Sequence, residues 1–156
     1  MPRSLAVARA NRVSTITYQL AFDIPDNLTQ PVKGRLRLSF LLSNTKTDLP
    51  LDFAGKAVQP LAHINGKTFK AKWLDEHILL PHQALRRGIN VVDLAFTADD
   101  KSLNRHADYL YSLFVPANAR TVFPCFRCGF RVQTNIPRSI PPRYSPILAG
   151  GKMYCQ

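Results

Sequence analysis

The side chains that could hold a metal ion or do redox chemistry are three cysteines near the end of this 156-residue chain. Cys125 and Cys128 form a C-x-x-C pair, and Cys155 is the only cysteine that follows them. A structural zinc site needs four ligands, and no histidine follows His106 to complete the set. A redox pair would open a helix after a strand, but this pair is followed by glycine and β-branched residues. We interpret the pair as a chance spacing, with a zinc site and a redox site as the alternatives.

The groups of a hydrolytic active site do not occur in any recognisable arrangement in the sequence. A zinc peptidase needs two histidines four residues apart on a helix, with a glutamate between them as general base. The single glutamate, Glu76, precedes His77 instead, and His82 follows across a proline, so these side chains cannot share a helical face. No G-x-S-x-G motif is present, and Cys125 is flanked by proline and phenylalanine. We therefore expect surface or hydrogen-bonded structural histidines, and no peptide hydrolysis by this chain alone.

The chain carries a formal net charge of +11, which raises the question of a nucleic-acid partner. The distribution of this charge argues against one, because much of the excess lies after residue 126, where no acidic residue occurs. Before that point the basic residues are scattered singly along extended segments, where alternation places them on the solvated face. The best candidates for a phosphate-binding stripe are Lys33, Arg35 and Arg37. A basic β-domain that binds an acidic partner such as nucleic acid stays as the alternative function.

The bulk composition indicates one folded domain without a membrane segment. Hydrophobic residues make up 46% of the chain and charged residues 20%, which supplies enough apolar side chain for a core. No apolar run approaches the ~20 residues of a membrane-spanning helix. Arginine interrupts the short apolar stretch at the N-terminus, so the sequence shows no convincing signal peptide. We expect no membrane partner, and with the compartment unknown the cytoplasm is favoured.

Apolar residues alternate with polar ones in several segments, as they do in half-buried β-strands. Residues 15–24 show this pattern, residues 32–42 repeat it, and we expect these two strands to pair. Asn65-Gly66 is the strongest turn signal, because both central residues of a type I′ turn need a positive φ. This turn would join residues 61–64 to residues 68–73 in a hairpin. Further extended segments are expected at residues 49–53, 57–64, 77–80 and 89–96.

About seven strands at a spacing of roughly 8 to 12 residues, with no long helical period, predict an all-β fold. The expected architecture is a β-sandwich or a set of curved, saddle-like antiparallel sheets. The polar segment of residues 97–106 is predicted to be an exposed loop between strands.

One segment resembles a signature of a known enzyme family. Residues 109–126, YLYSLFVPANARTVFPCF, resemble a sequence in the aminopeptidase N family of zinc metallopeptidases. In that family Asp-Ala-Arg, two further residues and Phe-Pro-Cys-Phe-Asp-Glu/Gln-Pro lie near the end of a non-catalytic, all-β N-terminal domain. The similarity stops after residue 126, although the order of the expected strands follows the family from residue 15 onward. The matching residues are Asn118, Ala119, Arg120, Phe123, Pro124, Cys125 and Phe126.

The resemblance implies a domain organisation and a function. Residues 1–14 would be an N-terminal extension, residues 15–126 the aminopeptidase N-like β domain, and residues 127–156 a divergent basic tail that partly resembles the next family strand. The domain would be incomplete at its C-terminal end, and residues 127–139 would reflect a disrupted reading frame or a divergent fragment. In the full enzyme such a domain is a scaffold and cap of the active site, and its partner is the catalytic domain of the parent peptidase. Zinc and peptide substrate belong to that full enzyme, so no cofactor is expected in this chain.

Individual residues of the segment receive expected roles from the resemblance and from their chemistry. Where the family has a glutamine that helps to hold the substrate's amino group, this chain has Leu113, which offers no acceptor. Leu113 and Phe114 would contribute only apolar contact to a substrate pocket, and the alternative is that both are strand-core residues. Arg120 is expected to satisfy several carbonyls with its planar guanidinium. The Phe-Pro-Cys-Phe residues are expected to pack in the interior.

Overall fold

The computed structural model describes Arg9, residues 11–99, 102–106 and 118–126, and the backbone of residues 110–112 and 152–155. These residues form open antiparallel β-sheets, which confirms the predicted all-β fold class. The strands outnumber the roughly seven expected from the sequence, because several are very short. They are β1 (Val13–Asp23), β2 (Lys33–Leu42), β3 (Leu49–Asp52), β4 (Ala57–Val58), β5 (Leu61–Ile64), β6 (Lys67–Lys70), β7 (Lys72–Leu74), β8 (His77–Leu80), β9 (Gly88–Thr97), β10 (Leu103–Arg105), β11 (Leu110–Ser112) and β12 (Lys152–Cys155), with a 3-10 helix η1 (His82–Ala84) and a short helix α2 (Ala119–Val122).

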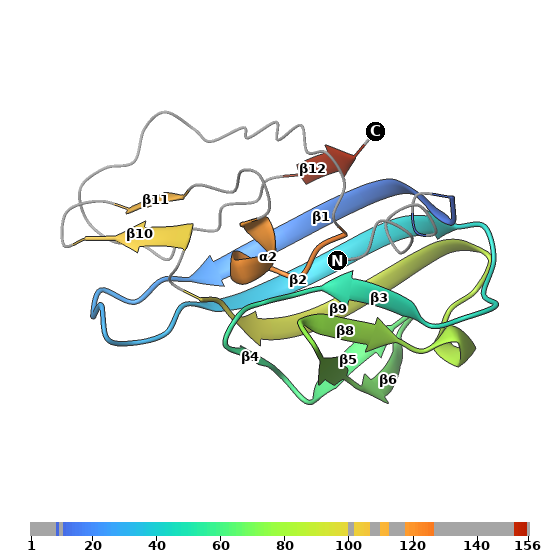
Figure 1. Cartoon of the computed structure of the whole chain (residues 1–156), viewed down its shortest axis with the longest axis horizontal. Coiled ribbons are helices and arrows are strands. Elements are labelled where there is room, and N and C mark those ends of the chain that lie inside the picture. The colour runs from blue at the N-terminus through green and yellow to red at the C-terminus, as the bar shows by residue number, and fades with distance from the viewer. Residues whose placement is uncertain are drawn as a thin grey trace.

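The largest sheet has seven strands in the order β12-β1-β2-β9-β5-β6, with β4 paired to β9. Figure 1 shows β1, β2 and β9 as long strands that run side by side through the molecule. The predicted pairing of the first two strands is confirmed, from Val13 opposite Leu42 to Asp23 opposite Lys33. A three-stranded sheet, β3-β8-β7, and the pair β10-β11 contain the other described strands.

The core lies against one face of the large sheet, as the alternation along β2 shows. Leu36 and Leu38 are at most 2% exposed, whereas Arg37 between them is exposed. Across the core, the ring of Phe96 on β9 meets that of Phe53, next to β3, edge-to-face with the centroids 5.4 Å apart. The large sheet and the three-stranded sheet therefore share the core, and the outward row of β2 lies on an exposed sheet face.

The Asn-Gly hairpin is present, but its second strand is shorter than predicted. Asn65 and Gly66 have φ of 52° and 81°, the two positive values that a type I′ turn needs, and they join β5 to β6. The chain then leaves the large sheet, since β7 pairs with β8 in the three-stranded sheet. Trp73 is held there by its indole N–H, which donates to the Phe53 carbonyl at 3.0 Å. The prediction of one strand over residues 68–73 is therefore wrong.

The polar segment predicted to be an exposed loop is partly buried. Ala98, Ser102 and Leu103 are at most 7% exposed, and Leu103 begins β10. The Ala98 N–H donates to the Val32 carbonyl at 2.9 Å, and the Thr121 hydroxyl donates to that of Ser102 at 2.9 Å. The prediction is wrong because partners distant in sequence satisfy these polar groups, which composition does not reveal.

Parts of both predicted terminal segments belong to the β structure. Arg9, in the predicted N-terminal extension, is 5% exposed, and β1 already begins at Val13. In the predicted tail, β12 pairs with β1, and Cys155 lies opposite Ile16. The described parts of these segments therefore add one buried cation to the core and one edge strand to the large sheet.

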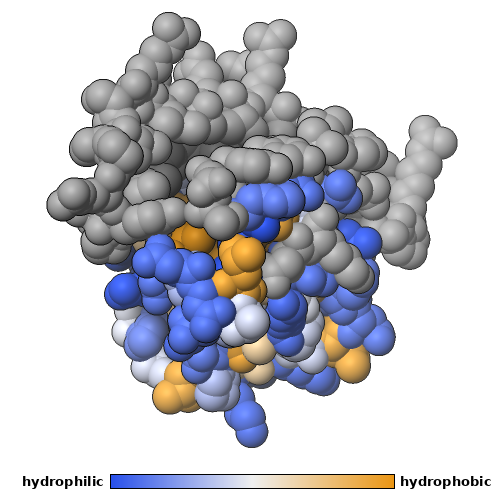
Figure 2. All heavy atoms as spheres, turned by 90° about the vertical axis from the view of Figure 1, so that its left-hand side faces the viewer, coloured by the Kyte–Doolittle hydropathy of each residue, from blue (hydrophilic) through white to orange (hydrophobic). Residues whose placement is uncertain are grey.

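The described residues present a mainly hydrophilic surface on one side of the molecule. Figure 2 shows one end of the molecule, where hydrophilic side chains surround a few separate apolar ones. Single exposed apolar side chains of this kind are ordinary on a protein surface. Over the described residues, no helix combines the length and the apolar character needed to cross a membrane.

Gly34 is a position at which the large sheet has no room for a side chain. A Cβ there would lie 2.2 Å from the ring of Phe96. That ring has little freedom to withdraw, because it packs edge-to-face against both Phe22 and Phe53. We therefore expect Gly34→Ala to lower the free energy of unfolding by about 1–3 kcal/mol, measured by urea denaturation. Arg35→Ala, at an outward position on the same strand, should change it by less than about 0.5 kcal/mol, and equal losses for the two variants would contradict the clash.

Candidate functional site

The segment that resembles the family signature lies inside the protein. Asn118 occupies the N-cap of α2, where its side chain makes no capping bond. Ala119 and Val122 of this single helical turn are buried. After the helix the chain is extended and buried, which confirms the predicted interior packing of Phe123, Pro124, Cys125 and Phe126.

This segment connects the two main sheets through direct contacts. The Phe126 ring packs edge-to-face on Phe40 of β2 at 5.4 Å, and the Phe126 N–H donates to the hydroxyl of Tyr18 on β1 at 2.9 Å. On the other side, Cys125 forms an antiparallel bridge with Asp52 of β3, with two N–H···O bonds of 2.9 Å. The residues that carry the resemblance therefore form a structural junction between the sheets.

Arg120 does not use the carbonyl acceptors expected from the sequence. Its Nη1 donates to the carboxylate of Glu76, in the turn between β7 and β8, and forms an ion pair there. Its own backbone carbonyl accepts the Ala54 N–H at 2.7 Å, just after β3. The prediction is wrong in the kind of acceptor, because a carboxylate within reach binds a guanidinium more strongly than a neutral carbonyl does. Arg120 thus ties α2 to the three-stranded sheet.

A buried charged cluster beside the junction is a feature that the sequence did not predict. The Arg9 guanidinium donates from Nη2 to both carboxylate oxygens of Asp52, at 3.0 and 3.1 Å, and from Nη1 to the Pro50 carbonyl at 3.1 Å. His77 Nε2 lies 3.2 Å from the same carboxylate. The side chains of Arg9 and Asp52 are only 6% and 4% exposed. Because both charges are out of water, each helps to compensate the other.

His77 and His82, which lie before and after Pro81 in the sequence, are hydrogen-bonded structural residues, as predicted. His77 Nδ1 lies 2.5 Å from the Asp75 carbonyl, in addition to its contact with Asp52. His82 places its backbone nitrogen and its ring Nδ1 each 2.8 Å from one carboxylate oxygen of Asp48. The bond from the His82 backbone N–H, followed by that from the ring, holds the pKa of Asp48 below its usual value.

Several predicted site residues lie outside the described residues. They are Leu113 and Phe114, expected to line a substrate pocket, and Cys128 of the C-x-x-C pair. Cys155 is described only in its backbone, as part of β12. Within the part of the chain that the structure describes, no group of three or more histidine, cysteine or carboxylate side chains could hold a metal ion. The interpretation of the C-x-x-C pair as a chance spacing therefore stays a prediction, with the zinc site and the redox site as its alternatives.

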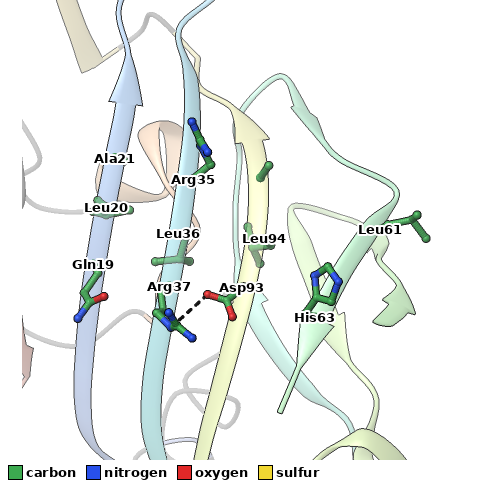
Figure 3. Close-up of a pocket in the computed structure, with 11 residues that line it drawn as sticks. Gln19, Leu20, Ala21, Arg35, Leu36, Arg37, Leu61, His63, Asp93 and Leu94 are labelled. Atoms are coloured by element: carbon green, nitrogen blue, oxygen red, sulfur yellow. Dashed lines mark ion pairs between the residues drawn. The ribbon is translucent and has the colours of Figure 1, made fainter. Parts of the chain in front are cut away.

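A groove of about 660 Å³ crosses the outward face of the large sheet, and Figure 3 shows the side chains that line it. Its lining comes from β1, β2, β9 and β5, which are neighbours in the sheet. The backbone register aligns one row of side chains across these four strands. Gln19 lies opposite Arg37 on the next strand. Asp93 lies opposite Arg37 on the other side and opposite His63 beyond it.

Basic side chains predominate over acidic ones in this groove. Arg37 Nε lies 3.4 Å from Asp93 Oδ1, in the exposed ion pair that Figure 3 marks with a dashed line. The side chains of Arg35 and His63 make no hydrogen bond or ion pair with any residue that the structure describes. Of the predicted basic stripe, Arg35 and Arg37 line the groove, whereas Lys33 does not. No local pattern in the sequence marks His63 or Asp93, because only the strand register brings them into this row.

The described residues therefore provide a packed junction in the core and a basic groove on the outward sheet face. The junction itself has no exposed reactive group, because its cysteine and aromatic side chains are buried. Comparison with known proteins gives no assignment, since no family model matches the chain and no curated protein matches its sequence.

Proposed function

We propose that this chain is the non-catalytic N-terminal β domain, or a fragment of it, of an aminopeptidase N-like zinc metallopeptidase. In the full enzyme it would act as scaffold and cap of the active site, with the catalytic domain of the parent peptidase as its partner. The observation that supports this is the place of residues 118–126, where the resemblance to the family signature coincides with a junction between two sheets. A segment that packs and bonds within its own domain stabilises the structure of that domain. A scaffold needs such a stable structure.

In the full enzyme, the zinc ion and the peptide-cleaving groups would belong to the catalytic domain. The chain has no H-E-x-x-H motif, and its single glutamate, Glu76, is engaged by Arg120. A general base must be placed where it can take a proton from the metal-bound water. A glutamate that lies on a turn and is paired with an arginine is not placed in this way. His77 is likewise engaged by Asp52. With Leu113 at the family's glutamine position, the contribution of this domain to a substrate pocket would be apolar.

The first test is an activity assay on the purified full chain. Incubated with zinc and the 4-nitroanilides of leucine and alanine, the chain should release nitroaniline no faster than buffer does, because it carries no zinc-peptidase motif. An active enzyme of the family, assayed under the same conditions, is the positive control. Turnover by this chain that a chelator abolishes would contradict a non-catalytic role.

A second experiment tests the scaffold role directly. An enzyme of the family that lacks its own N-terminal β domain is mixed with the full chain, and complex formation is followed by size-exclusion chromatography. We expect a one-to-one complex, because the deletion uncovers the surface that such a domain would occupy. The intact enzyme, whose surface is already covered, is the control and should not bind. Failure to bind the truncated enzyme would count against the scaffold role, whereas an H-E-x-x-H motif in the genomic sequence downstream would support it.

A further inference from the structure

The groove on the large sheet carries charged side chains that the proposed scaffold role does not explain. Arg35, Arg37 and His63 line it, and Asp93 is the one acidic side chain among the described lining residues. Asp93 compensates Arg37 in part, at 3.4 Å, whereas Arg35 and His63 have no such contact within the described residues. The groove therefore presents an uncompensated guanidinium beside an ion pair, which is a favourable setting for a carboxylate.

The floor of the groove leaves room for a chain laid across the strands. Ala21 and Ala95 flank Arg35 in the register, so small side chains lie on either side of the guanidinium. Leu61, which is 62% exposed, offers an apolar contact at the β5 end. Four adjacent strands about 4.8 Å apart span about 14 Å, a length that an extended peptide covers with about four residues.

We propose that this groove binds an extended acidic peptide segment of a protein partner. One carboxylate of the segment is held by Arg35 in bidentate geometry, and an apolar side chain lies against Leu61. The pair of Arg37 and Asp93 flanks the segment, with the aspartate available to accept a backbone N–H. A nucleic acid fits less well, because none of the described lining residues is a phenylalanine, tyrosine or tryptophan on which a base could stack. This inference does not depend on the scaffold role.

The test is fluorescence anisotropy with the full chain and two labelled peptides. The probe is a short peptide of alternating leucine and glutamate, and the control probe has glutamine in place of each glutamate. We expect saturable binding of the acidic peptide that weakens as the salt concentration rises, since its contacts are between charges partly open to solvent. The glutamine peptide should bind about tenfold more weakly or worse, because a neutral amide replaces the charge-assisted bond.

Two variants should move the affinity in opposite directions, a pattern that misfolding cannot imitate. Arg35→Gln removes the main partner of the carboxylate and should weaken binding about tenfold. Asp93→Asn removes the like charge and releases Arg37, so it should tighten binding about threefold. Arg87→Gln, at an exposed arginine outside the groove, is the matched control and should leave the affinity within about twofold of the unaltered chain.

The results of these binding experiments distinguish an acidic peptide from a nucleic acid as the ligand of the groove. Weaker binding by Arg35→Gln together with tighter binding by Asp93→Asn supports an acidic peptide. Unchanged affinity in both variants would overturn the proposal, and so would failure of the acidic peptide to bind the unaltered chain. A single-stranded oligouridylate that binds more tightly than the peptide, with the same dependence on Arg35, would make nucleic acid the occupant and overturn the peptide.

Discussion

Asp52→Ala is expected to lower the free energy of unfolding by about 3–5 kcal/mol. The change removes the Asp52 carboxylate from a guanidinium that is only 6% exposed, and with it the two hydrogen bonds that Arg9 Nη2 donates to this carboxylate. His77 loses its contact with the same carboxylate. Removing one partner of a buried ion pair costs several kcal/mol, and the whole stability of a domain of this size is about 5–15 kcal/mol. Urea denaturation, followed by the fluorescence of the single tryptophan, Trp73, measures the loss.

Two comparison variants separate the buried pair from surface charge in general. Asp93→Ala breaks the exposed pair with Arg37 and should cost less than about 1 kcal/mol. Replacing both buried partners, Arg9→Met with Asp52→Leu, should restore most of the loss, because no uncompensated charge then stays in the core. A loss below about 1 kcal/mol for Asp52→Ala would mean that Arg9 does not dock on β3 in solution.

The long strands could be predicted because the information that defines them is local. Apolar side chains at every second position mark the buried face of a strand without reference to any other part of the chain. The alternation in residues 15–24 and 32–42 accordingly predicts β1 and β2 closely. The turn at Asn65-Gly66 is local in the same sense, because its geometry depends on the φ angles of those two residues alone.

The distribution of strands between sheets could not be predicted, because it depends on contacts between distant residues. β6 and β7 follow one another almost directly, yet they belong to different sheets. The exchange occurs at Ala71, whose N–H donates to the Pro60 carbonyl at 2.9 Å, and no residue type nearby signals it. The pair of Arg9 and Asp52 joins residues 43 positions apart, so no periodic pattern could connect them.

In the candidate sites, too, the features that depend on local sequence could be predicted, and those that depend on distant contacts could not. The interior packing of residues 123–126 followed from their apolar types, and the structure confirms it. In the groove, Arg35 and Arg37 lie two positions apart on one strand, so the sequence alone placed them on one face. Asp93 and His63 complete the row only because β9 pairs with both β2 and β5. Local alternation therefore identifies one side of such a groove, and the strand register supplies the rest.

Phe123→Ala is expected to cost about 3–5 kcal/mol of unfolding free energy, because it opens a cavity at the junction between the sheets. Phe123 is 1% exposed, and its ring packs edge-to-face on that of Tyr18 with the centroids 6.2 Å apart. Its backbone N–H donates to the Ala119 carbonyl at 3.0 Å, so the residue is fixed at the end of α2 and its surroundings have little freedom to collapse. The urea midpoint, compared at unchanged slope, measures the loss.

Control variants distinguish packing at the junction from the loss of apolar side chains in general. Phe123→Leu keeps much of the volume and should cost about 1.5 kcal/mol or less. Ile89→Ala truncates a side chain that is 62% exposed and should change stability by less than about 0.5 kcal/mol. If Phe123→Ala cost no more than Ile89→Ala, the segment would not be bound into the core. The proposed scaffold role would then lose its support, since a sequence resemblance without a structural role does not distinguish a scaffold from a chance similarity.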